Sequence, residues 1–185
     1  MVKRKIYLCR MAENHTIKQL RDEDVEALIT LVNSAYRGEG SKKGWTTEAD
    51  IIEGSLRVDL QSIKDMLLEP GAAILTCHVN DILSGCVYLK AEGTSLYLGM
   101  LCVSPEAQGL GIGKKLLIAA EVHAQEFKYA DIHMTVIDIR HELIAWYERH
   151  GYSLTGETKP FHDDERFGKA IQPIKFIVLK KMINA

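Results

Sequence analysis

The feature that most constrains the fold of this chain is a turn with three alternating glycines, Gln108-Gly-Leu-Gly-Ile-Gly113. It follows a strand-like run that ends at Val103 and precedes a run with the apolar spacing of a helix. Because glycine has no Cβ, its backbone can approach a phosphate closely, and the first N–H groups of a helix have no acceptor within the helix. Lys114 and Lys115 add positive charge at the same point. The sequence therefore predicts an anion-binding turn at a helix N-terminus.

The spacing of these glycines excludes two well-known nucleotide-binding turns. A P-loop requires glycine where Gln108 stands and serine or threonine where Lys115 stands. The dinucleotide fingerprint G-x-G-x-x-G requires one more residue before its third glycine, and it follows a strand of a parallel sheet. Here the preceding strand continues a series with the pattern of an antiparallel meander. A glycine-rich connector that serves only tight packing is the alternative to an anion site.

Apolar periodicity predicts strands and helices around one sheet. Strand-like runs occur at residues 16–20, 73–79, 82–91, 95–103, 131–137, 152–155 and 174–180. Helical runs occur at residues 25–36, 59–68, from the glycines to 127, and 140–150, whereas residues 37–50 are expected to form a long loop. We expect an α/β (α+β) fold with a mixed, mostly antiparallel central sheet of about seven strands flanked by about four helices. The run 96–103, apolar on both faces, should lie near the centre of the sheet.

The overall composition limits the number of domains and the classes of partner. A chain of 185 residues suffices for one sizeable core, and we expect residues 1–11 to be a disordered N-terminal extension and residues 12–185 to form the domain. The formal net charge of -2 gives no basic field, so we expect no nucleic acid and no membrane as partners. Four cysteines without a CxxC pair, and no apolar run of the ~20 residues that cross a bilayer, favour a cytoplasmic protein.

Covalent catalysis and metal binding have little support in the sequence. Cys102 lies in an apolar run without a flanking base, which favours a core residue over a nucleophile. The run His162-Asp-Asp-Glu165 offers one histidine among charges and lacks the ligand spacing of a metal site. We therefore expect neither an acyl-enzyme nor a metal.

Two segments resemble motifs of the GCN5-related N-acetyltransferase (GNAT) family. Val103-Ser-Pro-Glu-Ala-Gln-Gly-Leu-Gly-Ile-Gly-Lys114 resembles motif A, whose core is (Q/R)-x-x-G-x-(G/A). Ala145-Trp-Tyr-Glu-Arg-His-Gly-Tyr152 resembles motif B at the expected distance. The resemblance implies the acyl-CoA N-acyltransferase (GNAT) fold and acetyl-CoA as co-substrate. It also implies transfer of the acetyl group to a primary amine by direct attack in a ternary complex.

The resemblance further implies roles for individual residues. By this resemblance, the pantetheine arm would pair with the backbone of Leu101, Cys102 and Val103. The pyrophosphate would be bound by Gln108, Gly109, Leu110, Gly111, Ile112, Gly113 and Lys114. His141 stands where many members carry asparagine, and is either a substitute cofactor contact or an exposed polar residue. Tyr147 stands where the family usually places the general acid that protonates the leaving thiolate.

The acceptor side is less defined by the sequence. Trp45 lies between the first two helices, a region that typically lines the acceptor site in this family, although an indole folded over the core fits equally well. A strongly basic amine favours a general base, and the candidates, all by default surface carboxylates, are Glu39, Glu92, Asp138 and Glu157. A polyamine, an antibiotic, a peptide amino terminus and a protein lysine all remain open, as does a homodimer. The alternative function is a non-catalytic acyl-CoA-binding sensor or interaction module.

Overall fold

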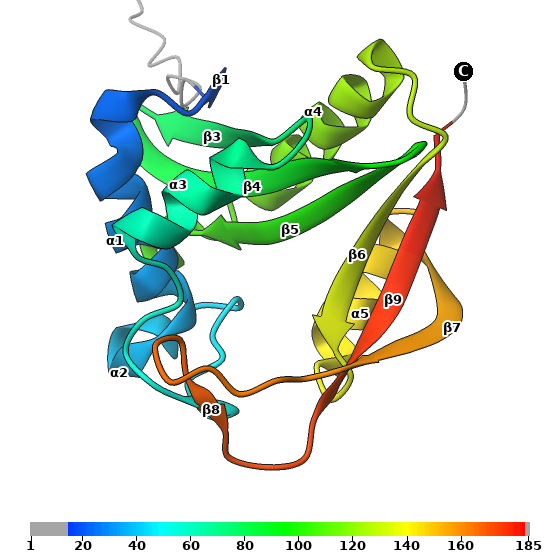
Figure 1. Cartoon of the computed structure of the whole chain (residues 1–185). Coiled ribbons are helices and arrows are strands. Elements are labelled where there is room, and N and C mark those ends of the chain that lie inside the picture. The colour runs from blue at the N-terminus through cyan, green and yellow to red at the C-terminus, as the bar shows by residue number, and fades with distance from the viewer. Residues whose placement is uncertain (1–14, 184–185) are drawn as a thin grey trace, which may run out of the picture.

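The computed structural model describes residues 15–183, so the predicted extension at residues 1–11 lies outside the described residues (Figure 1). Within that range seven strands form one sheet in the order β1-β3-β4-β5-β6-β9-β7. They are β1 (His15–Gln19), β3 (Ala73–Val79), β4 (Ile82–Glu92), β5 (Ser95–Val103), β6 (Asp131–Ile137), β9 (Lys175–Met182) and β7 (Ser153–Pro160). In this sheet β5 and β6 run parallel, and the other neighbouring pairs are antiparallel. The predicted mixed, mostly antiparallel sheet with the 96–103 run at its centre is confirmed.

Five α-helices lie within the described residues, one more than expected. They are α1 (Val25–Tyr36), α2 (Gly38–Ser41), α3 (Leu60–Leu68), α4 (Ile112–Glu126) and α5 (His141–Arg149). The extra helix, α2, is a single turn inside the segment that we expected to be a loop. Asp59 begins α3 through a capping box, because Asp59 Oδ1 accepts the Ser62 N–H at 2.7 Å and the Ser62 hydroxyl accepts the Asp59 N–H at 2.9 Å. Among residues 15–183 no helix has both the length and the apolar character needed to span a membrane.

A second, two-stranded sheet was not expected from the sequence. It pairs β2 (Ile52–Glu53) with β8 (Lys169–Ala170), so that two loops more than a hundred residues apart are joined. The predicted strand 152–155 also proves longer, because β7 continues to Pro160 with all of its residues exposed. A strand at the sheet edge with no buried face lacks the apolar alternation by which its length could be recognised.

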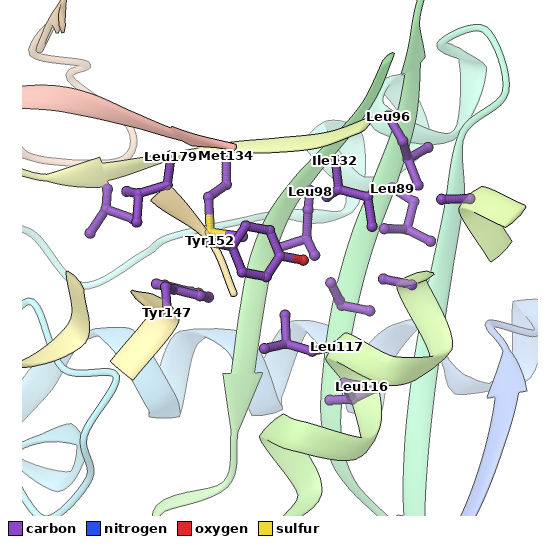
Figure 2. Close-up of a cluster of buried hydrophobic side chains, with 14 of the residues drawn as sticks. Leu89, Leu96, Leu98, Leu116, Leu117, Ile132, Met134, Tyr147, Tyr152 and Leu179 are labelled. Atoms are coloured by element: carbon purple, nitrogen blue, oxygen red, sulfur yellow. The ribbon is translucent and has the colours of Figure 1, made fainter. Parts of the chain in front are cut away.

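The sheet packs a hydrophobic layer on each face, and β5 contributes to both. Figure 2 shows the layer towards α4 and α5, in which Leu116 and Leu117 of α4 lie beside Leu98 of the sheet. The opposite layer packs α1 and α3 against Met100 and Cys102 of β5. The side chains of β5 change from one face to the other at a bulge. Tyr88 of β4 pairs with Gly99 and Cys86 pairs with Cys102, so β5 has one more residue than β4 between these pairs. Met100, inside the bulge, has a left-handed φ of 49°.

The two central strands separate soon after they meet. β5 pairs with β6 only where Ser95, Leu96 and Tyr97 face Asp131, Ile132 and His133. Beyond this point β5 continues along β4 and β6 along β9, and Figure 1 shows the two strands diverging from one end of the sheet. The backbone of β5 after Tyr97 therefore faces an open space on the side where a partner strand would lie.

Candidate active site

A cleft of about 660 Å³ fills the space between the diverging strands β5 and β6. Its walls come from both faces of the sheet. On the face of α4 and α5 lies the glycine turn, residues 108–114, which we call the glycine end. Tyr147 of the neighbouring helix α5 lies on the same face. On the α1 and α3 face lies the loop end, made of Tyr36, Trp45, Glu48 and Arg57. The cleft thus passes through the sheet.

The glycine end has the geometry of an anion-binding turn. Gly109 and Gly111 have φ values of 82° and 75°, which disfavour residues with a Cβ, and Gly111 is the N-cap of α4. A Cβ at either position would meet no atom within 4 Å, so open space lies against the turn. Lys114 lines the cleft, whereas Lys115 turns to contact the imidazole of His15 on β1. The turn therefore combines free space, the N–H groups at the start of a helix and one cation.

Most of the residues expected to hold the cofactor are gathered at this cleft. Its lining includes Leu101, Cys102, Val103, Gln108, Gly109, Gly111, Ile112, Gly113 and Lys114. Two predicted residues are absent from its lining: Leu110 projects from the turn with 39% exposure, and His141 is exposed at the first residue of α5. Cys102 is buried with its Sγ 3.6 Å from Cys86 Sγ, as befits a strand residue of the core.

The side chain of Gln108 is occupied within the protein. Its Oε1 accepts the Trp45 N–H at 2.9 Å and its Nε2 donates to the Val103 carbonyl at 3.4 Å. The side chain therefore joins the end of β5 to the loop that carries Trp45. Besides the second hydrogen of Nε2, the backbone of Gln108 is what is left to contribute to the anion-binding turn.

Tyr147 of α5 lines the cleft. The residue is 6% exposed, and its ring meets Trp146 and Tyr152 edge to face. Burial raises the pKa of its phenol well above the ordinary value, with a smaller contribution from Tyr97. The phenol therefore stays protonated throughout the neutral range and holds a proton inside the cleft.

Arg140, which the sequence did not single out, holds the loop end in place. Its buried guanidinium donates to the Thr47 carbonyl at 2.7 Å, to the Trp45 carbonyl at 2.5 Å and to Glu142 Oε1 at 2.7 Å. Trp45 is thus fixed through its backbone by Gln108 and Arg140, while its indole stays 47% exposed at the cleft. An arginine before a helix carries no sequence signal for contacts with a loop more than ninety residues away.

The four carboxylates considered as bases are absent from the lining of the cleft. Glu39 is exposed and pairs with Lys42, and Asp138 accepts a backbone N–H from Lys175. The other two lie on strands, Glu92 beside His133 and Glu157 on the exposed β7. The carboxylate that does line the cleft is Glu48, which accepts a hydrogen bond from Arg37 at 2.5 Å.

Glu48 is held rigidly at the loop end. Its backbone N–H donates to the Tyr36 carbonyl at 2.9 Å, and its side chain is only 14% exposed. Arg37 also donates to the Phe167 carbonyl at 3.2 Å, which fixes the cation of the pair. Tyr36 in turn donates its hydroxyl to the Leu101 carbonyl at 3.1 Å, and so ties this end to the central strand.

Comparison with family models gives a match to the middle of the chain. A family model described as an acetyltransferase (GNAT) domain matches residues 70–154, which include the glycine turn and Tyr147. Among curated proteins, none matches the sequence.

Several solved structures share the fold across most of the chain. The ribosomal-protein-S18-alanine N-acetyltransferase from Escherichia coli is 14% identical with a TM-score of 0.70, covering 93% of this chain and 96% of its own. The PaiA N-acetyltransferase from Thermoplasma acidophilum, solved in complex with coenzyme A, is 18% identical with a TM-score of 0.66, covering 91% and 99%. A putative acetyltransferase (yncA) from Salmonella typhimurium, solved with acetyl-CoA, is 17% identical with a TM-score of 0.65, covering 93% and 95%.

Proposed function

The chain contains an acetyltransferase domain of the GNAT family, and from this premise we propose that it transfers the acetyl group of acetyl-CoA directly to a primary amine. The observation that carries the proposal is the cleft between β5 and β6, which brings the glycine turn, the open edge of β5 and Tyr147 together. These features match the three needs of the reaction: a phosphate site, a polarised thioester carbonyl and a proton for the leaving thiolate.

The residues of the cleft fit an acyl-CoA. The space in front of Gly109 and Gly111 admits a pyrophosphate against the N-terminus of α4, with Lys114 as its cation. The edge of β5 beyond Tyr97 offers backbone groups with which the amide-containing pantetheine arm can pair in place of a strand. We place its contacts at Leu101, Cys102 and Val103, and leave Leu110 and His141 as weaker candidates because they lie away from the cleft lining.

In the proposed reaction the amine nitrogen bonds to the acetyl carbon while the C–S bond breaks. A backbone N–H of β5 polarises the carbonyl, and Tyr147 gives its proton to the departing sulfur. Ordinary pKa values make this proton transfer uphill by about 2 kcal/mol. Because burial raises the pKa of Tyr147 further, the proton should move only as the C–S bond breaks and negative charge grows on sulfur.

The amine must also lose a proton, which costs ~4.6 kcal/mol at pH 7 for a lysine-like amine and about 1 for an α-amine. We assign the acceptance of this proton to Glu48, directly or through water. It is the carboxylate of the loop end, and its Oε2 is already engaged by Arg37. Glu39, Glu92, Asp138 and Glu157 do not line the cleft and are therefore less suited to this role.

The proposed setting is the cytoplasm, where thiols stay reduced. Cys77, Cys86 and Cys102 are free and buried, which suits a reducing compartment. The sequence is compatible with a homodimer. The exposed edge strand β7 suits such an interface, because an edge strand has unpaired backbone groups that can bind a second copy.

The function is tested by mixing the purified protein with acetyl-CoA and a panel of primary amines, and by measuring thiol release together with the mass of the acetylated amine. We expect a gain of one acetyl group on at least one amine. We also expect CoA to raise the melting temperature more than ATP or NAD, since a ligand at ~100 times its Kd stabilises by ~2.7 kcal/mol. Stabilisation by acetyl-CoA without modification of any amine would instead support the sensor.

A further inference from the structure

Arg57 is a cation of the cleft that has no counter-ion among the residues that the structure describes. Arg140, the other arginine in the lining, pairs with Glu142 at 2.7 Å, and Arg37 behind the cleft pairs with Glu48 at 2.5 Å. Within residues 15–183 no carboxylate lies within ion-pair distance of the Arg57 guanidinium. Arg57 is half-buried, and a charge withdrawn from water is stabilised by a partner of opposite sign. The loop end thus holds an unpaired positive charge.

The position of Arg57 is fixed by the fold. Asn33 of α1 accepts the N–H groups of Arg57 and Val58 on its Oδ1 at 2.6 and 3.0 Å, and donates its Nδ2 to the Val58 carbonyl at 2.9 Å. The guanidinium lies over the ring of Tyr36, 5.5 Å from the centroid. The planar guanidinium carries N–H groups along its edges, and these can bind a carboxylate in bidentate fashion.

Glu48 lies beside the same tyrosine. Both Glu48 and Arg57 act electrostatically on the Tyr36 phenol, in opposite directions. In the part of the chain that the structure describes, Glu48 Oε2 is engaged by Arg37 and no donor is placed on Oε1. The loop end therefore presents one carboxylate oxygen without a placed donor and one guanidinium without a carboxylate, both near Tyr36.

We propose that the acceptor is a small primary amine that carries a carboxylate, with Arg57 binding the carboxylate and Glu48 binding the amino group. This inference rests on the proposed acetyltransferase function and narrows its acceptor. The hydroxyl of Tyr36 donates to the Leu101 carbonyl, so an amine held beside Tyr36 lies next to the open edge of β5.

The test compares acceptors in two matched pairs. In the first pair an amino acid is compared with its primary amide, and in the second the same amino acid is compared with the amine that lacks the carboxylate altogether. Each pair is measured with the wild-type protein and with the variants Arg57→Gln and Arg57→Lys. The control Arg149→Gln removes the same charge from an exposed position of α5 outside the cleft. The KM of acetyl-CoA is measured in parallel, because a variant that misfolds would raise it too.

We expect the wild-type protein to prefer the carboxylate-bearing member of a pair by about 10- to 100-fold in kcat/KM, since hydrogen bonds between charged groups are the strong ones. Arg57→Gln should remove most of that preference through the KM of the acceptor, Arg57→Lys should retain part of it, and Arg149→Gln should leave it intact.

Equal transfer to both members of each pair, or an equal loss for both in Arg57→Gln, would overturn the inference while the acetyltransferase function stands. Absence of transfer to any amine would overturn both.

Discussion

The glycine end of the cleft is built from backbone, whereas the loop end is built from side chains that come from the end of helix α1 and from two later loops. At the glycine end, the φ values of Gly109 and Gly111 and the start of α4 create the site within a few consecutive residues. At the loop end, Trp45 and Glu48 are held by Gln108, Arg140 and Arg37. A backbone site suits a co-substrate common to a whole family, while a site made of side chains can differ from one protein to the next.

The largest effect should follow a change at the glycine end. Gly111→Glu places a carboxylate in the space proposed for the pyrophosphate, so we expect the affinity for CoA to fall by at least ~100-fold from charge repulsion and blockage. Isothermal titration with CoA measures the loss. The control is Gly93→Glu in the turn between β4 and β5, where φ is also positive, at 64°, and a Cβ also meets no atom within 4 Å. Equal losses in the two variants would show that backbone strain, and not the turn, causes the effect.

The next effect concerns Tyr147, where the two ends meet. Tyr147→Phe removes the proposed proton donor, and we expect kcat to fall by about 100-fold while the Kd of CoA changes less than ~2-fold. Tyr152→Phe is the matched control, because Tyr152 is equally buried and its hydroxyl has no partner in the described structure, yet the cleft lining does not include it. Unchanged turnover of Tyr147→Phe between pH 6 and pH 9 would remove Tyr147 from the mechanism.

A smaller effect should separate the loop end from the glycine end. Arg140→Gln removes the hydrogen bonds to the carbonyls of Trp45 and Thr47, so we expect the KM of the acceptor to rise by about 10-fold. The Kd of CoA should change less than ~2-fold. Glu142→Gln, which leaves both carbonyl contacts in place, should have the weaker effect. If Arg140→Gln weakened CoA binding instead, the two ends would not be separable.

A separate effect, which does not depend on the cleft alone, is a loss of stability in alkali. Burial raises the pKa of Tyr147 and Tyr152, and raises that of Tyr88 to about 12. Above pH ~10 the unfolded chain releases these protons while the folded chain keeps them, so the free energy of unfolding should be constant up to that pH and then fall.

Each fully buried tyrosine should contribute about 1.4 kcal/mol per pH unit to this fall. Guanidinium unfolding between pH 8 and pH 11 measures it. Tyr152→Phe should make the fall less steep, and an unchanged slope in that variant would contradict the argument.

Much of the fold could be predicted because its signals are local. The strands 73–79 and 95–103 alternate or run apolar over their whole length, and helix α3 begins at the Asp59 cap. The glycine turn is equally local, since its φ values depend on the residues themselves. The short α2 and the pairing of β2 with β8 could not be predicted, because their stability comes from contacts between distant segments.

The same reason explains why the sequence assigns Glu48 only to the segment around Trp45, without a role of its own, and does not single out Arg57. Glu48 and Arg57 stand in loops without periodicity, and nothing in the neighbouring residues distinguishes them from surface charges. Their importance lies in what they face: Tyr36 for both, and Arg37 for Glu48. Residue type alone indicated carboxylates such as Glu39 and Glu92, but in the fold Glu39 pairs with Lys42 at the surface and Glu92 pairs with His133 of a neighbouring element.

The separation of β5 from β6 determines how the two substrates reach one another. The cleft passes through the sheet, with the glycine end on the face of α4 and the loop end on the face of α1. If CoA binds at the glycine end and the amine at the loop end, as we propose, neither substrate has to leave before the other can diffuse in or out. We expect a steady-state pattern of random order, in which the acetylated product can dissociate while CoA is still bound.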